Sequence, residues 1–370
     1  MTEQSAQAVF KEAERKRLRC RFEEALALYQ KAEALFQKAG DVESLLSCRL
    51  AQGHCLRPMG DFRLAAKQYR QTLQLAFLLD DRAAVADALV GLGMALRALG
   101  YVKDALKHFL KAERIYRRLE DEAGEAYTLW AKGGAFRFQG NFTAALLTFQ
   151  EALHCFKKQG NRAGAAYTLC GLGGVSRLMG RFEDSLRFYT EANEQFRALR
   201  DPFGRAYSFC GIANARRIVE DYETALAFFD KARALYQRIG DQVSYAYTIW
   251  GEGTTYKMLG RNQQALEDFI EADAIFRKTH DPRGRVYTRL GEGELLLLAG
   301  KPKQAERKFR QGLHAAERFG FRFEETHALL LLKLLQRAKG KHVSFDGLLK
   351  QYAKLGSDFL KEPSLPLNLP

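Results

Sequence analysis

The chain has 370 residues, of which 47% are hydrophobic, and a formal net charge of +14. No apolar run approaches the roughly eighteen residues that a membrane-spanning helix requires, and the charged N-terminal stretch lacks the apolar core of a secretory signal. The sequence therefore predicts a soluble, cytoplasmic protein, and its excess positive charge points to an acidic partner.

The sequence repeats every forty residues, in eight copies that follow one another without insertion. A glycine marks one phase of the repeat, with Cys20 and Glu220 in its place in two copies; it stands at Gly60, Gly100, Gly140, Gly180, Gly260 and Gly300. A small residue follows five positions later, at Ala25, Ala65, Ala105, Ala145, Ser185, Ala225, Ala265 and Ala305. An aromatic residue comes next, at Tyr29, Tyr69, Phe109, Phe149, Tyr189, Phe229, Phe269 and Phe309. Such a fixed period is typical of a solenoid, because each unit can bury its apolar face only against its neighbours.

Each repeat is expected to form two helices, here named helix A and helix B. An Asp or Asn suited to cap a helix N-terminus precedes helix A, at Asp41, Asp81, Asp121, Asn161, Asp201, Asp241 and Asp281. Helix A then runs about seventeen residues to the phase glycine, where a left-handed backbone can end it. Helix B begins two or three residues later and carries the small and aromatic residues on its inner face. Eight pairs give sixteen helices and an all-α fold.

The C-terminal part departs from the repeat. Residues 322–339 predict a ninth helix A, and residues 344–355 predict a short amphipathic helix that seals the end of the array. Residues 361–370 are too rich in proline for a helix and form a tail that is either disordered or laid along a surface. The expected organisation is a solenoid over 1–320, a capping region over 321–360 and the tail over 361–370. If the tail occupied the binding groove, it would inhibit the protein.

The repeat resembles that of tetratricopeptide repeat proteins. The fifth copy carries the pattern of that family at Leu169, Leu172, Gly173, Ser176, Ser185, Tyr189 and Ala192, and the fourth at Leu129, Gly133, Phe136, Ala145, Phe149 and Ala152. The usual repeat has thirty-four residues; the forty-residue kind is similar to that of spindle-orientation adaptors and bacterial peptide-sensing regulators. The resemblance implies a right-handed α-solenoid with a roomy concave groove.

One side of helix A, which lines the concave groove in the family, carries an aromatic column. It contains Tyr127, Tyr167, Tyr207, Tyr247 and Tyr287, accompanied by Trp130 and Trp250. A parallel column of Gly134, Gly174, Asn214 and Thr254 runs beside it. Two interpretations stay open: the tyrosines pack on their neighbours and stiffen the stack, or they anchor a partner, as amphipathic rings with little side-chain entropy often do.

A basic column follows near the C-terminal end of helix A, at Arg57, Arg97, Arg137, Arg177, Arg217 and Lys257, and Leu297 interrupts it. Cations in a last helical turn offset the helix dipole, which is one interpretation. The other is ligand binding, because a concave surface would focus their field.

The sequence predicts no enzyme, cofactor or metal site. It lacks the spacings of metalloproteases and serine hydrolases, and the GxG runs repeat in phase inside helices, which indicates packing glycines rather than phosphate loops. The six cysteines form no CxxC pair, and Cys170 and Cys210 are expected to remain reduced. The carboxylate clamp of chaperone-binding family members is missing apart from Asn214.

The leading hypothesis is a scaffold or adaptor whose groove binds a protein or peptide segment with acidic and apolar residues. One alternative is a sensor or carrier of small molecules or peptides. Another is binding of RNA or single-stranded DNA, which is less favoured because Glu252, Glu292 and Glu294 would meet phosphate. The oligomeric state and the identity of the partner stay open.

Overall fold

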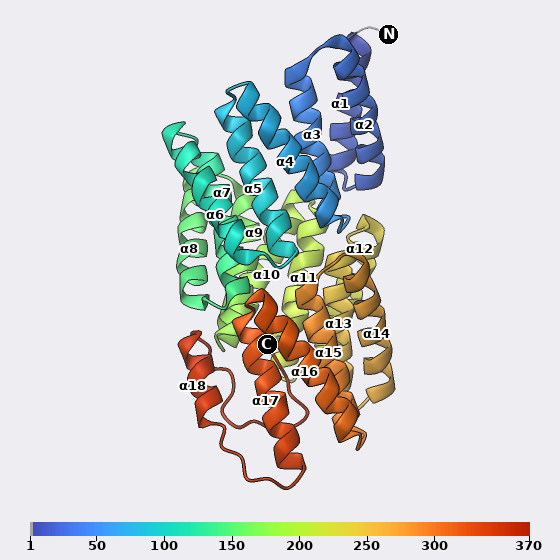
Figure 1. Ribbon diagram of the computed structural model, residues 1–370, viewed down its shortest axis with the longest axis vertical. Helices are drawn as coiled ribbons and strands as arrows, with labels where there is room; N and C mark the ends of the chain where they lie inside the picture. Colours follow the sequence, from blue (N-terminus) through green and yellow to red (C-terminus); the bar gives the residue numbers. More distant parts are fainter. Residues whose placement is uncertain (1–2) are drawn as a thin grey trace. The chain divides into compact units, whose positions relative to one another are not determined.

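The computed structural model describes residues 3–370, and every regular element in this range is a helix (Figure 1). The helices are α1 (Glu3–Leu18), α2 (Phe22–Ala39), α3 (Val42–Leu56), α4 (Phe62–Leu78), α5 (Arg82–Ala98), α6 (Val102–Arg118), α7 (Glu122–Gln139), α8 (Phe142–Lys158), α9 (Arg162–Leu178), α10 (Phe182–Leu199), α11 (Pro202–Ile218), α12 (Tyr222–Ile239), α13 (Gln242–Met258), α14 (Asn262–Lys278), α15 (Pro282–Leu298), α16 (Pro302–Phe319), α17 (Arg322–Ala338) and α18 (Asp346–Lys354). Consecutive helices pack on each other, which confirms an α-solenoid of helix pairs.

The ends of the helices lie where the repeat predicts them. The side chains of Asp41, Asp81 and Asn161 each accept a hydrogen bond from the backbone N–H three residues further on, at 2.8–3.0 Å. Helix A ends at a left-handed glycine, with φ of 80° at Gly60 and 86° at Gly180, a conformation that costs glycine little. Capping and termination are therefore local properties of each repeat.

Other glycines, inside helix A, make room for the aromatic ring of helix B. The ring of Phe149 on α8 lies between α7 and α9: a Cβ atom added at Gly133 would fall 2.8 Å from it, and one added at Gly171 would fall 2.6 Å from it. The same arrangement recurs for Phe269 between Gly253 and Gly291. This confirms that the GxG runs are packing glycines.

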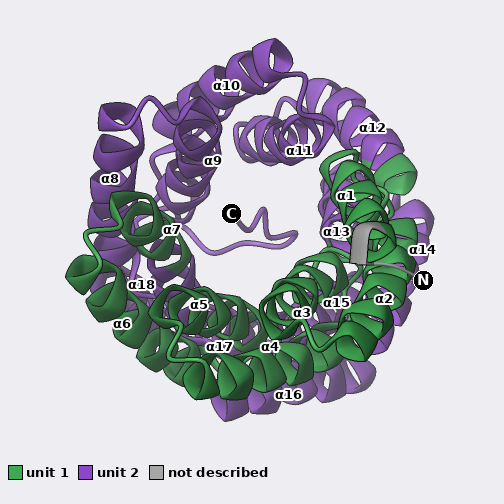
Figure 2. Cartoon of the chain, turned by 90° about the horizontal axis from the view of Figure 1, so that it is seen from above, with its two compact units in different colours: residues 1–131, 236–243 green, residues 132–235, 244–370 purple. Residues whose placement is uncertain are grey.

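The chain forms two compact units (Figure 2). Unit 1 comprises the described residues up to Ala131 together with Tyr236–Val243. Unit 2 comprises Lys132–Leu235 and Ser244–Pro370, and it contains most of the basic column. Within residues 3–370, none of the helices is both long and apolar enough to span a bilayer.

The C-terminal helices of unit 2 contact two much earlier repeats of the same unit. α18 packs on α17, and Phe323 of α17 packs edge-on against Phe142 of α8, with ring centroids 5.1 Å apart. The chain after α18 continues past α9, where the hydroxyl of Ser357 donates to the backbone carbonyl of Leu178. The last helices are therefore covered on one side by helices far away in sequence.

Asp268 on α14 makes the stability of unit 2 dependent on pH. Its Oδ2 is buried without a hydrogen-bond partner among the described residues, and burial together with repulsion from Glu252 raises the pKa of Asp268 to about 7. Since the usual pKa is 3.8, the folded protein binds more protons than the unfolded chain between about pH 4 and pH 7, and stability falls as pH rises through this window.

We therefore expect Asp268→Asn to raise the free energy of unfolding by about 1 kcal/mol at pH 8, a value discounted for partial exposure, and to change it little at pH 4. Urea unfolding at both pH values measures this difference. Glu151→Gln, which alters an exposed carboxylate on α8, is the control and should have no pH-dependent effect. An equal gain for Asp268→Asn at both pH values would contradict the assignment.

Candidate functional site

Three cations of the basic column, Arg57, Arg137 and Lys257, pack against the residue thirty-seven positions further along the chain, in the following repeat. In unit 1, Nη1 of Arg57 lies 2.6 Å from Sδ of Met94. In unit 2, the guanidinium of Arg137 lies directly over the backbone of Gly174, where a Cβ atom would collide with it. The glycine at 174 is therefore explained by close packing against a cation.

Lys257 and Glu294 form a buried ion pair in the same arrangement. Their side chains are 3% and 1% exposed, and Nζ of Lys257 donates to Oε2 of Glu294. Burial lowers the pKa of Lys257, although the attraction of Glu294 opposes this shift. Sequence reasoning missed Glu294 as a site residue, but the signal was available: it continues the column of Gly174, Asn214 and Thr254 by one repeat.

Arg217, at the C-terminal end of α11, is fully buried, and no carboxylate in residues 3–370 forms an ion pair with it. Its partners are neutral oxygens: Nη2 donates to Oδ1 of Asn214 at 3.2 Å and to the carbonyl of Leu369 at 2.7 Å, and Nη1 donates to Oδ1 of Asn368. Burial lowers the pKa of Arg217 to about 9, and the charge of Arg177 adds to this effect. The site therefore carries an unneutralised positive charge.

Arg137 and Arg177 have donors that no described residue satisfies. Nε of Arg137 is buried without a partner, and so are Nε and Nη1 of Arg177. Arg177 lies close enough to Arg217 for their positive charges to repel each other. The charges of Arg217 and Lys257 repel each other in the same way. We call Arg137, Arg177, Arg217 and Lys257 the cationic wall of unit 2. Arg97 lies in unit 1, where its Nη1 approaches the carbonyl of Ala131 at 3.4 Å.

Tyrosines of the aromatic column link successive repeats within unit 2. The hydroxyl of Tyr167 donates to Asp201 at 2.7 Å, and that of Tyr247 donates to Asp281 at 3.0 Å. Each of these aspartates also caps the N-terminus of the next helix A. Tyr207 occupies the corresponding place on α11 and is half-buried. The column thus braces neighbouring helices, and its role in ligand binding stays a prediction.

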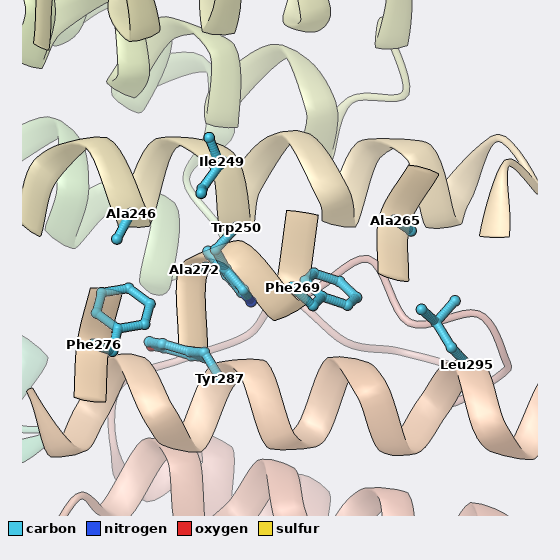
Figure 3. Packing of buried hydrophobic residues seen from close by; sticks show 9 residues of the cluster. All are labelled: Ala246, Ile249, Trp250, Ala265, Phe269, Ala272, Phe276, Tyr287 and Leu295. Atoms are coloured by element: carbon cyan, nitrogen blue, oxygen red, sulfur yellow. The ribbon is translucent and has the colours of Figure 1, made fainter. Parts of the chain in front are cut away.

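The two tryptophans occupy different environments. Trp250 is 8% exposed and packs against Tyr287, with ring centroids 4.6 Å apart, so that the two rings meet between α13 and α15 (Figure 3). The hydroxyl of Tyr287 also donates to Glu324 on α17 at 2.6 Å. In unit 1, Trp130 is half-buried and stacks on Tyr127, which is 37% exposed. Trp250 and Tyr287 therefore belong to the core of unit 2.

The C-terminal segment, residues 355–370, lies along the cationic wall. Within unit 2 it runs on the side of α9 and α11 that faces away from α10 and α12 (Figure 2). Nη2 of Arg337 donates to the carbonyl of Pro363 at 2.7 Å, and Nζ of Lys257 donates to that of Leu367 at 2.8 Å. The sequence left open whether the tail is disordered or laid along a surface. In the structure it is laid along a surface.

Comparisons with known proteins agree on the fold. The tetratricopeptide repeat model matches residues 84–158, 162–238 and 203–278. A search of curated protein sequences gives no match.

Three similar solved structures cover nearly the whole chain. The Rap protein complexed with Competence and Sporulation Factor is 17% identical with a TM-score of 0.60, and the alignment covers 95% of this chain and 100% of that one. NprR in complex with its cognate peptide NprX is 13% identical with a TM-score of 0.64, covering 94% and 97%. Aspartyl phosphate phosphatase F from Bacillus subtilis is 13% identical with a TM-score of 0.52, covering 99% and 98%. Because the matched repeats span more than half of the sequence, this chain belongs to the tetratricopeptide repeat family.

Proposed function

We propose that this chain is a non-catalytic scaffold or sensor that binds a protein or peptide segment with acidic and apolar residues at the cationic wall of unit 2. The observation that carries the proposal is the pair of buried, unsatisfied nitrogens of Arg177, next to the buried charge of Arg217. A buried donor without a partner costs about 1–3 kcal/mol, and a carboxylate placed there would recover this cost and neutralise the charge.

A peptide segment fits this site better than the other classes of ligand. Two of the similar structures are complexes, one with Competence and Sporulation Factor and one with a cognate peptide. Two cations of the wall, Arg217 and Lys257, already hold a stretch of polypeptide through hydrogen bonds to its backbone carbonyls. Nucleic acid is disfavoured because Glu294, which is paired with Lys257 of the wall, would face phosphate.

The test is a selection of random ten-residue peptides on the full chain. We expect enrichment of sequences that combine Asp or Glu with Leu, Ile or Phe, and at least a tenfold loss of binding by the selected peptides when Arg177 is replaced by Gln. Arg187→Gln is the matched control, because Arg187 is exposed on α10 and pairs with Asp184.

The same selection on a chain with Leu367→Glu covers the case in which the C-terminal segment hides the wall. Absence of enrichment on both chains would contradict the proposal. If the selected peptides bind the Arg177→Gln chain as tightly as the unmodified chain, their binding site is not the cationic wall.

A further inference from the structure

Residues 367–369 are held at α11, α13 and α15 as a peptide ligand would be held. Nζ of Lys257 donates to the carbonyl of Leu367, and Oε1 of Glu294 accepts a hydrogen bond from the N–H of the same residue. The buried ion pair thus forms hydrogen bonds with both the N–H and the carbonyl of Leu367. Backbone contacts of this kind give affinity without requiring a particular side chain.

The side chain of Asn368 is recognised at both ends. Its Oδ1 accepts from Nη1 of Arg217, and its Nδ2 donates to the carbonyl of Arg217 at 2.9 Å. This carbonyl belongs to the last turn of α11, where the carbonyl oxygens carry the negative end of the helix dipole, and it also accepts a hydrogen bond from the N–H of Glu220 at 3.0 Å. An amide satisfies both partners, whereas an aspartate would place its second oxygen against the carbonyl. The geometry therefore selects Asn at this position.

The two flanking leucines supply the apolar part of the contact. Leu367 is 2% exposed and Leu369 is 7% exposed, although both lie outside any regular element. Burial of these two leucine side chains favours docking and opposes the entropy cost of ordering the chain.

We propose that α11, α13 and α15 form a subsite for peptides with the pattern aliphatic–Asn–aliphatic, and that Leu367–Leu369 occupies it as an exchangeable intramolecular ligand. This inference rests on the proposed function, since it names the ligand class of the same wall. Exchange is feasible because Lys361, Glu362 and Ser364 are exposed, so that the stretch leading to the subsite is mostly solvated.

The tether makes the segment a strong competitor of an external peptide. A short linker gives an effective concentration in the millimolar range, so a free peptide with the same contacts binds far more weakly while the segment is docked. A partner that also satisfies Arg177 has contacts that the segment lacks, and it can therefore displace it. Only a partner that binds tightly enough to displace the segment can therefore occupy the subsite.

The experiment measures binding of fluorescently labelled SLPLNLP, the sequence of residues 364–370, to three forms of the full chain. Leu367→Glu opens the subsite, because it replaces an apolar side chain that is 2% exposed with a charged one that is costly to bury. We expect this chain to bind the peptide at least tenfold more tightly than the unmodified chain. Ser364→Ala alters an exposed residue of the same segment and should behave as the unmodified chain. Asn368→Ala serves as a second opened chain if Leu367→Glu does not fold.

The peptide itself carries the specificity test. Replacing its Asn by Ala or by Asp should weaken binding to the opened chain at least tenfold. No saturable binding to a folded, opened chain would overturn the subsite, and equal binding of the Ala peptide would overturn recognition of the amide. Equal binding to opened and unmodified chains would overturn occupation by the segment. Selection of acidic peptides through Arg177 can succeed or fail separately, so failure of the subsite and failure of the proposed function are distinguishable.

Discussion

Glu324→Ala is expected to lower the free energy of unfolding by about 3–5 kcal/mol. Glu324 on α17 is fully buried and accepts hydrogen bonds from Nε of Arg283 and from the hydroxyl of Tyr287, both at 2.6 Å. Burial alone would lower the pKa of Arg283. The attraction of Glu324 is stronger, so the pKa of Arg283 is raised. Truncation of Glu324 leaves the buried guanidinium without the carboxylate that pairs with it. Denaturant unfolding followed by circular dichroism measures the loss.

The partner substitution separates the charge effect from simple loss of packing. Arg283→Met added to Glu324→Ala removes the stranded cation, so the double variant should be more stable than Glu324→Ala alone. Glu306→Ala, which removes a carboxylate that is 31% exposed and pairs with Arg310 and Lys339, is the control and should change stability little. A double variant less stable than Glu324→Ala would show that the buried charge is not the cause.

Gly211→Ala is expected to lower the free energy of unfolding by about 2–3 kcal/mol. In an unhindered helix this change would stabilise by up to about 1 kcal/mol, because alanine loses less backbone entropy. Here the added Cβ atom would overlap the ring of Tyr189, which is 3% exposed and is confined on its other side by Gly173. The ring cannot move without displacing α9 or α11. Thermal and denaturant unfolding report the effect.

A control glycine in the same unit distinguishes overlap from a general effect of alanine. At Gly347 on α18, an added Cβ atom would meet no other atom within 4 Å, so Gly347→Ala should be neutral or slightly stabilising. Tyr189→Leu removes the ring, and Gly211→Ala should then cost much less in that background. An unchanged cost would mean that the two residues are not coupled.

Most of the fold could be predicted from the sequence because it is set within single repeats. Asp41 and Gly60 determine where helix A begins and ends through their own backbone and side-chain chemistry. The contact of Phe323 with Phe142 could not be predicted in this way. It depends on the angle between successive repeats, which accumulates from many small packing contributions and leaves no mark on the period.

The site could be predicted only in part for a similar reason. Arg217 and Lys257 were found because they stand at one phase of the repeat, and the same logic reaches Glu294 once the neighbouring column is followed to its end. Asn368 lies outside the repeat and meets Arg217 across 151 residues of sequence. A single asparagine in an irregular segment carries no periodic signal, so only coordinates bring the two together.

The contacts of the C-terminal helices with earlier repeats affect how unit 2 unfolds. In an open row of repeats, each unit touches only its neighbours, and the terminal unit frays first at small cost. Here the ring contact between α17 and α8, together with the bond from Ser357 to Leu178, fastens the last helices to elements near the start of the unit. Unfolding of the last helices then also breaks their contacts with α8 and α9, so we expect unit 2 to unfold as one cooperative block and not repeat by repeat.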